Sequence, residues 1–325
     1  MTDRSSTEEK VNKNLSKDIF DMTNSLPNLF KCAVHPLLQF REVCEIEFIR
    51  IENDSLAGCE KGTPETKTVN LIIFVAKFFY KDGYGDPLLS VIYLKFVGIS
   101  SISITKFIGN KFHCLFYNAA GNFYLAKHLE AYLKNSKSTL NFTQDFIYTW
   151  IRNDVILASC RALGIICRLL SEPYWKFAAD DSKCAIDMGN IYNRLVTFLK
   201  ICIENPKLLL ENKVSLSLGP STVLDDVSKH LFLSSNLDEK TKLYLKRFCM
   251  ALKLEVEVLF KDFLPNGKLY EPDANIIIHS ETCAPNNITV ERLMAKLDTS
   301  IKSSPNSNTY SKENAIMLRN NKTNE

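Results

Sequence analysis

The sequence predicts a mainly α-helical protein, built as a multi-helix globular domain. Apolar residues recur at steps of three and four in several long segments, and proline or glycine closes those segments. Of the 325 residues, 46% are apolar and 24% are charged, which is close to the average for globular proteins and excludes wholesale disorder. The 40 Lys and Arg residues nearly balance the 37 Asp and Glu residues, so no strong basic field indicates nucleic-acid binding.

We expect three regions along the chain. Residues 1–17 are polar and predict a disordered tail, residues 18–303 a single helical domain, and residues 304–325 a C-terminal helix with a polar tail. The N-terminus lacks the apolar core of a secretory signal. The longest apolar stretch, Leu71–Ala76, is followed by Lys77 and is too short to span a membrane. We therefore expect a soluble intracellular protein, nuclear or cytoplasmic and not secreted, with no membrane partner.

The helical periodicity of apolar residues is weaker in the N-terminal half of the chain. A helix is predicted from about Leu29 to Glu42, and the polar stretch Glu52–Lys67 predicts a loop. Two apolar stretches, Val69–Tyr80 and Leu88–Ile99, flank a glycine-containing turn. We favour a helix for the first stretch. For the second, helix and strand both stay open, because periodicity cannot separate them over so short a run.

Three helical stripes dominate the rest of the chain. The first covers residues 156–170 and is expected to stop before Pro173, and the second covers residues 191–202. The third covers residues 237–263, where Ser235 and Asp238 form a possible capping pair at its start. One face of this third helix can carry Tyr244, Phe248, Leu252, Leu259 and Phe263. Short helices near Val290–Ile301 and Ser311–Arg319 are expected to close the chain.

The chain contains no complete catalytic or metal-binding motif. Cys32 and His35 have the two-residue gap of half a zinc site, but no second pair at this spacing completes the four ligands that zinc needs. A structural role for both residues is the alternative to a metal site. Lys106 and Lys111 stand among aromatic residues and could contact a DNA backbone, although a solvated turn explains them about as well.

Four segments carry a family resemblance through their residues and their order. They are Cys32–Leu37 (CAVHPL), Tyr80–Pro87 (YKDGYGDP), Gly109–Ala120 (GNKFHCLFYNAA) and Val290–Asp298 (VERLMAKLD). This ordering resembles uncharacterised proteins that invertebrate transposable elements encode. The last segment is also similar to the closing Glu-Arg helix of hAT-superfamily transposases. The resemblance covers roughly residues 25–325.

The resemblance implies an RNase H-like sheet with a large helical insertion, in which three carboxylates bind two divalent metal ions. Glu291 would match the third carboxylate, and Arg292 follows it as in the family's helix. The first two carboxylates would lie upstream of Cys32, where Asp18 and Asp21 stand without an apolar strand to position them. The chain therefore resembles the C-terminal helical part of such a protein, with at most a small residual sheet.

A lone carboxylate cannot hold two metal ions, so we expect an incomplete DDE-type active site and no nuclease activity from the isolated chain. No cofactor is expected, and Mg²⁺ would bind only if the site were completed elsewhere. The structural interpretation of Glu291 is a first-turn carboxylate, which the helix dipole favours.

Two functional hypotheses follow. The first is a transposase-derived protein, catalytically incomplete, that retains helical self-association as a homo-oligomer or a weak, non-specific DNA contact through Lys106, Lys111 and Arg292. Such DNA binding would fall steeply with added salt. The alternative is an α-helical protein-interaction module with no nucleic-acid role, which agrees with the near-neutral charge.

Overall fold

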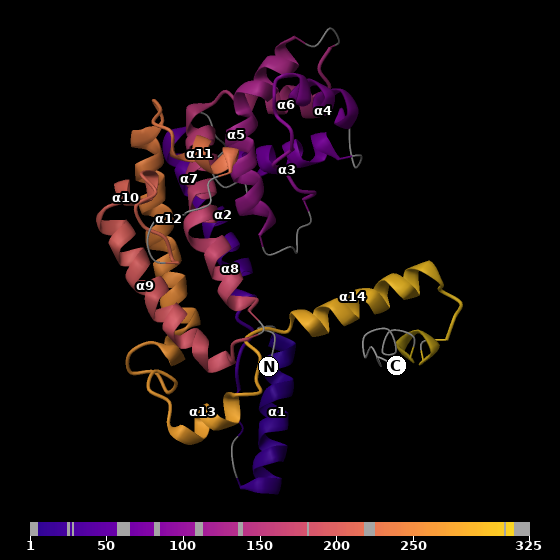
Figure 1. Ribbon diagram of the computed structural model, residues 1–325, viewed down its shortest axis with the longest axis vertical. Coiled ribbons are helices and arrows are strands. Elements are labelled where there is room, and N and C mark those ends of the chain that lie inside the picture. The colour runs from indigo at the N-terminus through magenta and orange to yellow at the C-terminus, as the bar shows by residue number, and fades with distance from the viewer. Residues whose placement is uncertain are drawn as a thin grey trace. The chain divides into compact units, whose positions relative to one another are not determined.

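The computed structural model describes residues 6–24, 27, 29–56, 66–80, 85–107, 113–135, 139–180, 182–217, 225–308 and 310–314 (Figure 1). These residues form helices and connecting segments, with no strand among them. The predicted mainly α-helical class is therefore confirmed. The two apolar stretches around the glycine-containing turn form helices α3 (Lys67–Phe79) and α4 (Pro87–Phe96).

The chain divides into two compact units. The first comprises the described residues of Met1–Val34, Ala178–Met188 and Asp273–Glu325, and the second those of His35–Phe177 and Gly189–Pro272. Residues 18–303, which we expected to form one domain, thus contribute to both units. No helix in the described ranges has both the length and the apolar content needed to cross a bilayer.

The first unit contains helices α1 (Ser6–Thr23), α13 (Ala274–Ser280) and α14 (Ile288–Ser303). Residues 6–17, which we expected in a disordered tail, belong to α1, where Val11, Leu15 and Ile19 recur every four residues. Residues 311–314 of the predicted terminal helix are also helical, and the rest of that helix lies outside the described residues.

Backbone hydrogen bonds join three distant segments of the first unit. The N–H of Ala33 donates to the carbonyl of Pro285 at 2.8 Å, and the N–H of Ala185 donates to the carbonyl of Cys283 at 2.7 Å. The side-chain amide of Asn286 donates to the carbonyl of Ala178 at 2.9 Å. Residues some 100 to 250 positions apart along the chain therefore build this unit together, which explains why the N-terminal segment does not belong to the second unit.

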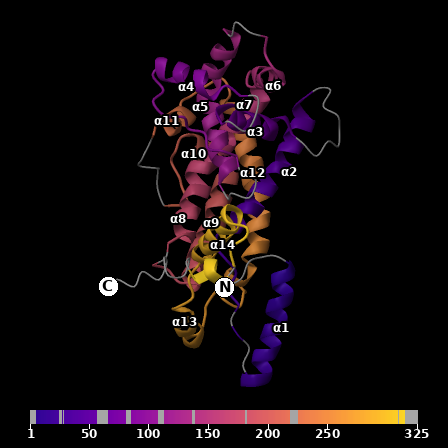
Figure 2. The same ribbon diagram turned by 90° about the vertical axis from the view of Figure 1, so that its right-hand side faces the viewer.

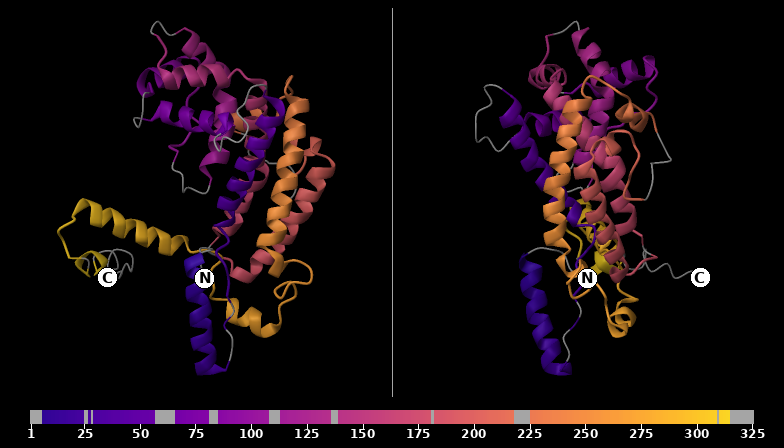
Figure 3. Two further views of the ribbon diagram at one scale, coloured as in Figure 1. Left: turned by 180° about the vertical axis from the view of Figure 1, so that it is seen from behind. Right: turned by 90° about the vertical axis from the view of Figure 1, so that its left-hand side faces the viewer.

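The second unit contains most of the helices. Apart from one terminal residue each of α8 and α9, they are α2 (Pro36–Ser55), α3, α4, α5 (Cys114–Lys134), α6 (Phe142–Trp150), α7 (Asp154–Ile166), α8 (Glu172–Ala178), α9 (Met188–Glu204), α10 (Lys207–Leu210), α11 (Asp226–Phe232) and α12 (Asp238–Leu259). Helices α3, α4 and α6 gather around one end of α5 (Figure 1, Figure 2). Helix α12 packs against α2 and α7 and lies between α2 and α9 (Figure 3).

Two helix starts follow from proline chemistry. Helix α2 begins at Pro36 and not near Leu29 as predicted, because a first-turn proline has a suitable φ and needs no N–H partner. Helix α4 begins at Pro87, and the carboxylate of the preceding Asp86 accepts a hydrogen bond from the N–H of Leu89 at 3.2 Å. Both starts are thus determined locally.

The helical path continues past Pro173, so the predicted stop before this residue is wrong. After α7 the chain forms a π-helix, Cys167–Ser171, and then passes directly into α8. Pro173 is the second residue of α8. There its missing N–H costs little, because the wider π-helical turn has already changed the hydrogen-bond pattern.

Helices α5 and α7 approach each other closely through small residues. A Cβ atom added at Gly164 would lie 2.8 Å from the Cα of Ala120. On another side of α5, a Cβ at Gly121 would collide with the backbone carbonyl of Ser103. These glycines therefore set the distance at which the backbones pack.

Candidate functional site

An exposed apolar stripe runs along α12, the helix that the sequence placed at residues 237–263. Leu243, Met250, Leu254 and Val258 recur at helical spacing and are between 49% and 68% exposed. The opposite side of the helix buries Thr241, Tyr244, Leu245, Phe248, Cys249, Leu252 and Val256. Helix α12 is therefore apolar on two sides. Single exposed apolar residues are ordinary, but a row of four along one helix is typical of an interaction site.

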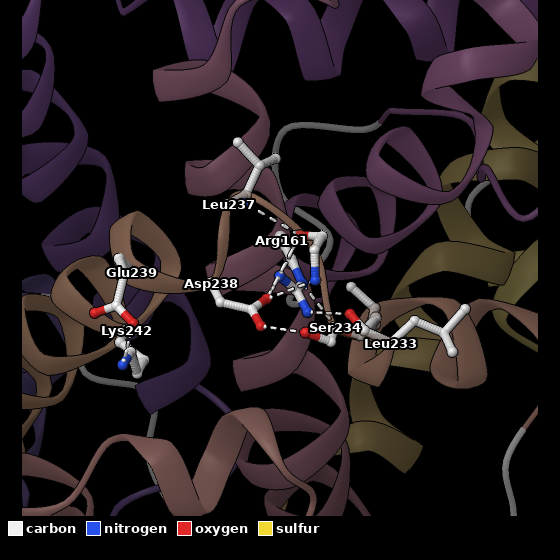
Figure 4. Close-up of polar contacts among 9 residues, drawn as sticks. Arg161, Leu233, Ser234, Leu237, Asp238, Glu239 and Lys242 are labelled. Atoms are coloured by element: carbon white, nitrogen blue, oxygen red, sulfur yellow. Dashed lines mark hydrogen bonds and ion pairs between the residues drawn. The ribbon is translucent and has the colours of Figure 1, made fainter.

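A buried arginine fixes the N-terminal end of α12. Arg161 of α7 is 0% exposed, and Figure 4 shows its guanidinium surrounded by the segment that leads into α12. Its Nη1 donates to the carboxylate of Asp238 at 2.6 Å and to the hydroxyl of Ser235 at 2.9 Å. Its Nε and Nη2 donate to the carbonyls of Leu231 (2.9 Å) and Leu233 (2.6 Å). Each nitrogen of the buried guanidinium thus has a hydrogen-bond partner, which offsets the cost of burying the charge.

The predicted capping pair of Ser235 and Asp238 forms only in part, because the N-cap of α12 is Leu237, which has no side-chain cap hydrogen bond. The backbone N–H of Ser235 donates to the carboxylate of Asp238 at 3.1 Å, and the hydroxyl of Ser234 donates to it at 2.9 Å. Partial burial pushes the pKa of Asp238 upward, but the hydrogen bonds from Arg161, Ser234 and Ser235 outweigh burial and hold this pKa below its ordinary value. The carboxylate therefore stays charged opposite Arg161.

An ion-pair network fixes the middle of α12 to α2. The Nη1 atom of Arg247 lies 2.7 Å from the carboxylate of Asp54, and its Nε donates to Glu47. Glu47 is buried, and its carboxylate also forms an ion pair with Arg50 at 3.1 Å. Arg247 stands between Leu243 and Met250 on the face of the stripe, and these contacts hold its side chain toward α2.

Aromatic packing fixes the C-terminal end of α12. Phe260, the first residue after the helix, stacks on Tyr192 of α9 with ring centroids 3.7 Å apart. The side-chain amide of Asn193 donates to the carbonyl of Phe263 at 2.9 Å. Phe263 lies in a short 3₁₀ helix, Lys261–Phe263, and not in α12 as predicted. The stripe is therefore carried by a helix that is held at both ends.

Charged residues beside the stripe are distributed unevenly. Lys240 and Lys246 are exposed in the N-terminal half of α12, and Glu255 and Glu257 are partly exposed in its C-terminal half. Lys253 pairs with Glu257 at 2.8 Å. The N-terminal half of α12 thus has four basic residues against Asp238 and Glu239, and the C-terminal half has two glutamates against Lys253.

Helix α4 presents a second exposed apolar face, which is shorter. Leu88, Leu89, Ile92 and Phe96 are between 54% and 87% exposed, whereas Leu94 is buried on the other side. The helix has 10 residues against 22 in α12. This face gives a matched comparison for substitutions in the stripe of α12.

A buried polar cluster lies where α5 begins beside the π-helix. The Nε2 of His113 is 2.9 Å from the hydroxyl of Ser171, and both ring nitrogens are 4.0 Å from the thiol of Cys167. Burial lowers the pKa of His113 to about 4; Glu172 opposes this shift and Arg168 adds to it. Burial likewise raises the pKa of the Cys167 thiol. A thiol that stays protonated is a poor nucleophile, so the cluster serves packing better than catalysis.

The predicted catalytic residues do not meet in one place. Glu291 is partly exposed and Arg292 exposed, both in the first turns of α14, and Asp18 and Asp21 are exposed on α1. Among the described residues, no group of three or more His, Cys, Asp or Glu side chains could hold a metal ion. The first-turn position of Glu291 is the one that the structural interpretation requires.

The predicted metal and DNA residues occupy different surroundings. The thiol of Cys32 donates to the side-chain carbonyl of Asn287 at 3.0 Å, and His35 directly precedes α2. Lys106 is exposed on the segment between α4 and α5. Lys111 lies outside the described residues.

Sequence reasoning missed the exposed stripe of α12. The sequence does show apolar residues at 243, 250, 254 and 258 beside the face that was predicted to be buried. These residues make the helix apolar on more than one side, which could have indicated an exposed apolar face. Periodicity alone does not say which side packs against the rest of the protein.

Comparisons with known proteins add no relative: no family model matches the chain, and neither does a curated protein or a solved structure.

Proposed function

We propose that this chain is an α-helical protein-interaction module that self-associates into a homo-oligomer through exposed helical surface. The observation that supports the proposal is the stripe of Leu243, Met250, Leu254 and Val258 on α12. Burial of one such side chain is worth about 1.5–3 kcal/mol when it is complete. A helix already fixed on its inner side loses little conformational freedom when its outer side is covered.

The proposal is tested by sedimentation velocity over a concentration series. We expect the wild-type chain to pass from monomer to oligomer as its concentration rises. Leu254→Glu should shift this transition to higher concentration, because it places a charge in the contact. A wild-type chain that stays monomeric at every attainable concentration would contradict the proposal.

The matched control is Leu88→Glu on α4, since Leu88 and Leu254 have similar exposure, 69% and 66%. We expect this variant to associate like the wild type. Circular dichroism melts of both variants should match the wild type, because neither side chain is buried in the fold. A loss of association with Leu88→Glu and not with Leu254→Glu would assign the interaction to α4.

The second candidate function is a transposase-derived, catalytically incomplete protein with a weak DNA contact. It rests on the family resemblance and on the exposure of Lys106 and Arg292. These two residues belong to different units, and neither is accompanied by a dense basic cluster in the sequence. The interaction module therefore has the better support.

A further inference from the structure

We infer that α12 pairs antiparallel with α12 of a second copy of this chain, across a two-fold axis near the middle of the exposed stripe. The inference rests on the proposed function and names its partner surface. Each step below uses the exposed side of α12 and the charges beside it.

The stripe has the dimensions of one helix–helix contact. From Leu243 to Val258 it is about 22 Å long at the rise of an α-helix. A strip of this length and one helix wide covers well under the ~800 Å² that each partner contributes to a standard interface. We therefore expect a weak, concentration-dependent dimer and not a permanent one.

The order of charges along α12 selects the antiparallel direction. Lys246 lies one turn before Met250, and Glu257 lies two turns after it, so both stand on the same edge of the stripe. In a parallel pair, the basic half of one helix would lie beside the basic half of the other, and the acidic halves would likewise lie together. In an antiparallel pair the basic half of each helix meets the acidic half of the other.

One register brings the two central apolar residues together and also pairs charges beside them. If Met250 faces Leu254 of the second copy, then Lys246 lies opposite residue 258 and beside Glu257 of that copy. A two-fold axis produces this pairing twice, because the same surface of each copy contacts the other. Lys253, which already pairs with Glu257 at 2.8 Å, would complete a network of three charges on each side.

The surface does not need to rearrange to make this contact. Arg161 holds the start of α12 through Asp238, and Tyr192 stacks on Phe260 just after its end. The inner side of the helix is buried in the second unit. A helix held in this way is preorganised for pairing, which lowers the entropic cost of association.

Charge reversal tests the register directly. Lys246→Glu and Glu257→Lys should each raise the dissociation constant of the homodimer by about tenfold, because each variant creates two like-charge contacts across the axis. An equimolar mixture of the two variants should recover wild-type affinity, since each copy then presents the charge that the other lacks. Analytical ultracentrifugation of the single variants and of the mixture provides the measurement.

The control is Lys229→Glu on α11, which reverses an exposed lysine paired with Asp226 at 3.2 Å. It should leave the dissociation constant unchanged, alone and in mixtures. If the wild type dimerises but the mixture shows no recovery, the antiparallel register is wrong while the proposed function stands. If the wild type does not dimerise at all, both the register and the proposed function are wrong.

Discussion

Arg161 joins two helices through a single buried guanidinium. Its donors satisfy two backbone carbonyls and the carboxylate of Asp238. Removing the guanidinium takes one hydrogen-bond donor away from each of these partners, and a buried acceptor that loses its donor is costly. The position of α12, and with it the stripe, therefore depends on this residue.

We predict that Arg161→Met lowers the free energy of unfolding by about 1–3 kcal/mol, because buried acceptors lose their donor. Methionine keeps much of the side-chain volume but removes the hydrogen bonds that Arg161 donates to Asp238 and to both carbonyls, while Asp238 keeps those from Ser234 and Ser235. Urea denaturation followed by circular dichroism measures the loss. Arg41→Met provides the control, because the pair Arg41–Glu45 is a partly exposed i, i+4 contact at 2.7 Å, for which we expect a change of at most about 1 kcal/mol. Equal losses in the two variants would contradict the role of Arg161.

His113 gives the fold a specific dependence on pH. Burial lowers its pKa from 6.5 to about 4 in the folded chain, so the unfolded chain binds a proton first as the pH falls. The stability that the neutral histidine contributes is therefore complete above about pH 6.5 and is lost progressively toward pH 4.

We predict that His113→Gln removes part of this pH dependence. In the wild type, the contribution of His113 to the slope should approach at most about 1.4 kcal/mol per pH unit between these limits. Unfolding titrations at several pH values compare the two slopes. Identical slopes in wild type and variant would show that His113 titrates alike in the folded and unfolded chain.

At the scale of elements, the packing of α5 against α7 depends on a missing side chain. Gly164 lies so close to α5 that a Cβ would reach the backbone of Ala120. Alanine normally favours a helix over glycine by about 1 kcal/mol. Here the steric conflict should outweigh that gain.

We predict that Gly164→Ala lowers the free energy of unfolding by about 1–3 kcal/mol. The matched control is Gly189→Ala in α9, where the new Cβ would meet only a ring carbon of Phe263 at 3.3 Å. That variant should be neutral or slightly stabilised. Thermal melts of both variants separate the outcomes, and a stabilised Gly164→Ala protein would contradict the close approach.

The positions of the helices could be predicted from the sequence better than the features that depend on tertiary packing. The stripe at 191–202 falls in α9, that at 156–170 in α7 and the π-helix, and most of that at 237–263 in α12, because 3.6-residue periodicity is a local property. Pro173 misled the prediction, since a π-helical turn places it where its missing N–H is harmless. The helix-or-strand question at 88–99 needed tertiary packing to decide it, because both states suit a short apolar run.

The candidate site was harder to predict than the fold. Whether Leu254 is exposed while Leu252 is buried depends on where α2, α7 and α9 lie, and no local pattern contains that information. The predicted chemistry at Glu291 rests on a family resemblance. It stays a prediction, as do the metal role of Cys32 and the DNA role of Lys106.

At the scale of the whole molecule, charge separates the two proposed functions. The net charge of +3 gives little electrostatic attraction for a polyanion. We predict that a gel-shift assay with duplex DNA shows no retardation even at low salt. Retardation that falls steeply with salt and weakens in Lys106→Ala and Lys111→Ala would instead favour the transposase-derived function.

Self-association through α12 is tested most directly by hydroxyl-radical footprinting of two methionines. Met250 lies in the stripe and Met294 lies on α14, and they are 49% and 61% exposed. Oxidation of Met250 should slow as the protein concentration is raised through the association range, while oxidation of Met294 stays constant. A Met250 that is oxidised equally fast in the associated protein would contradict an interface on this face of α12.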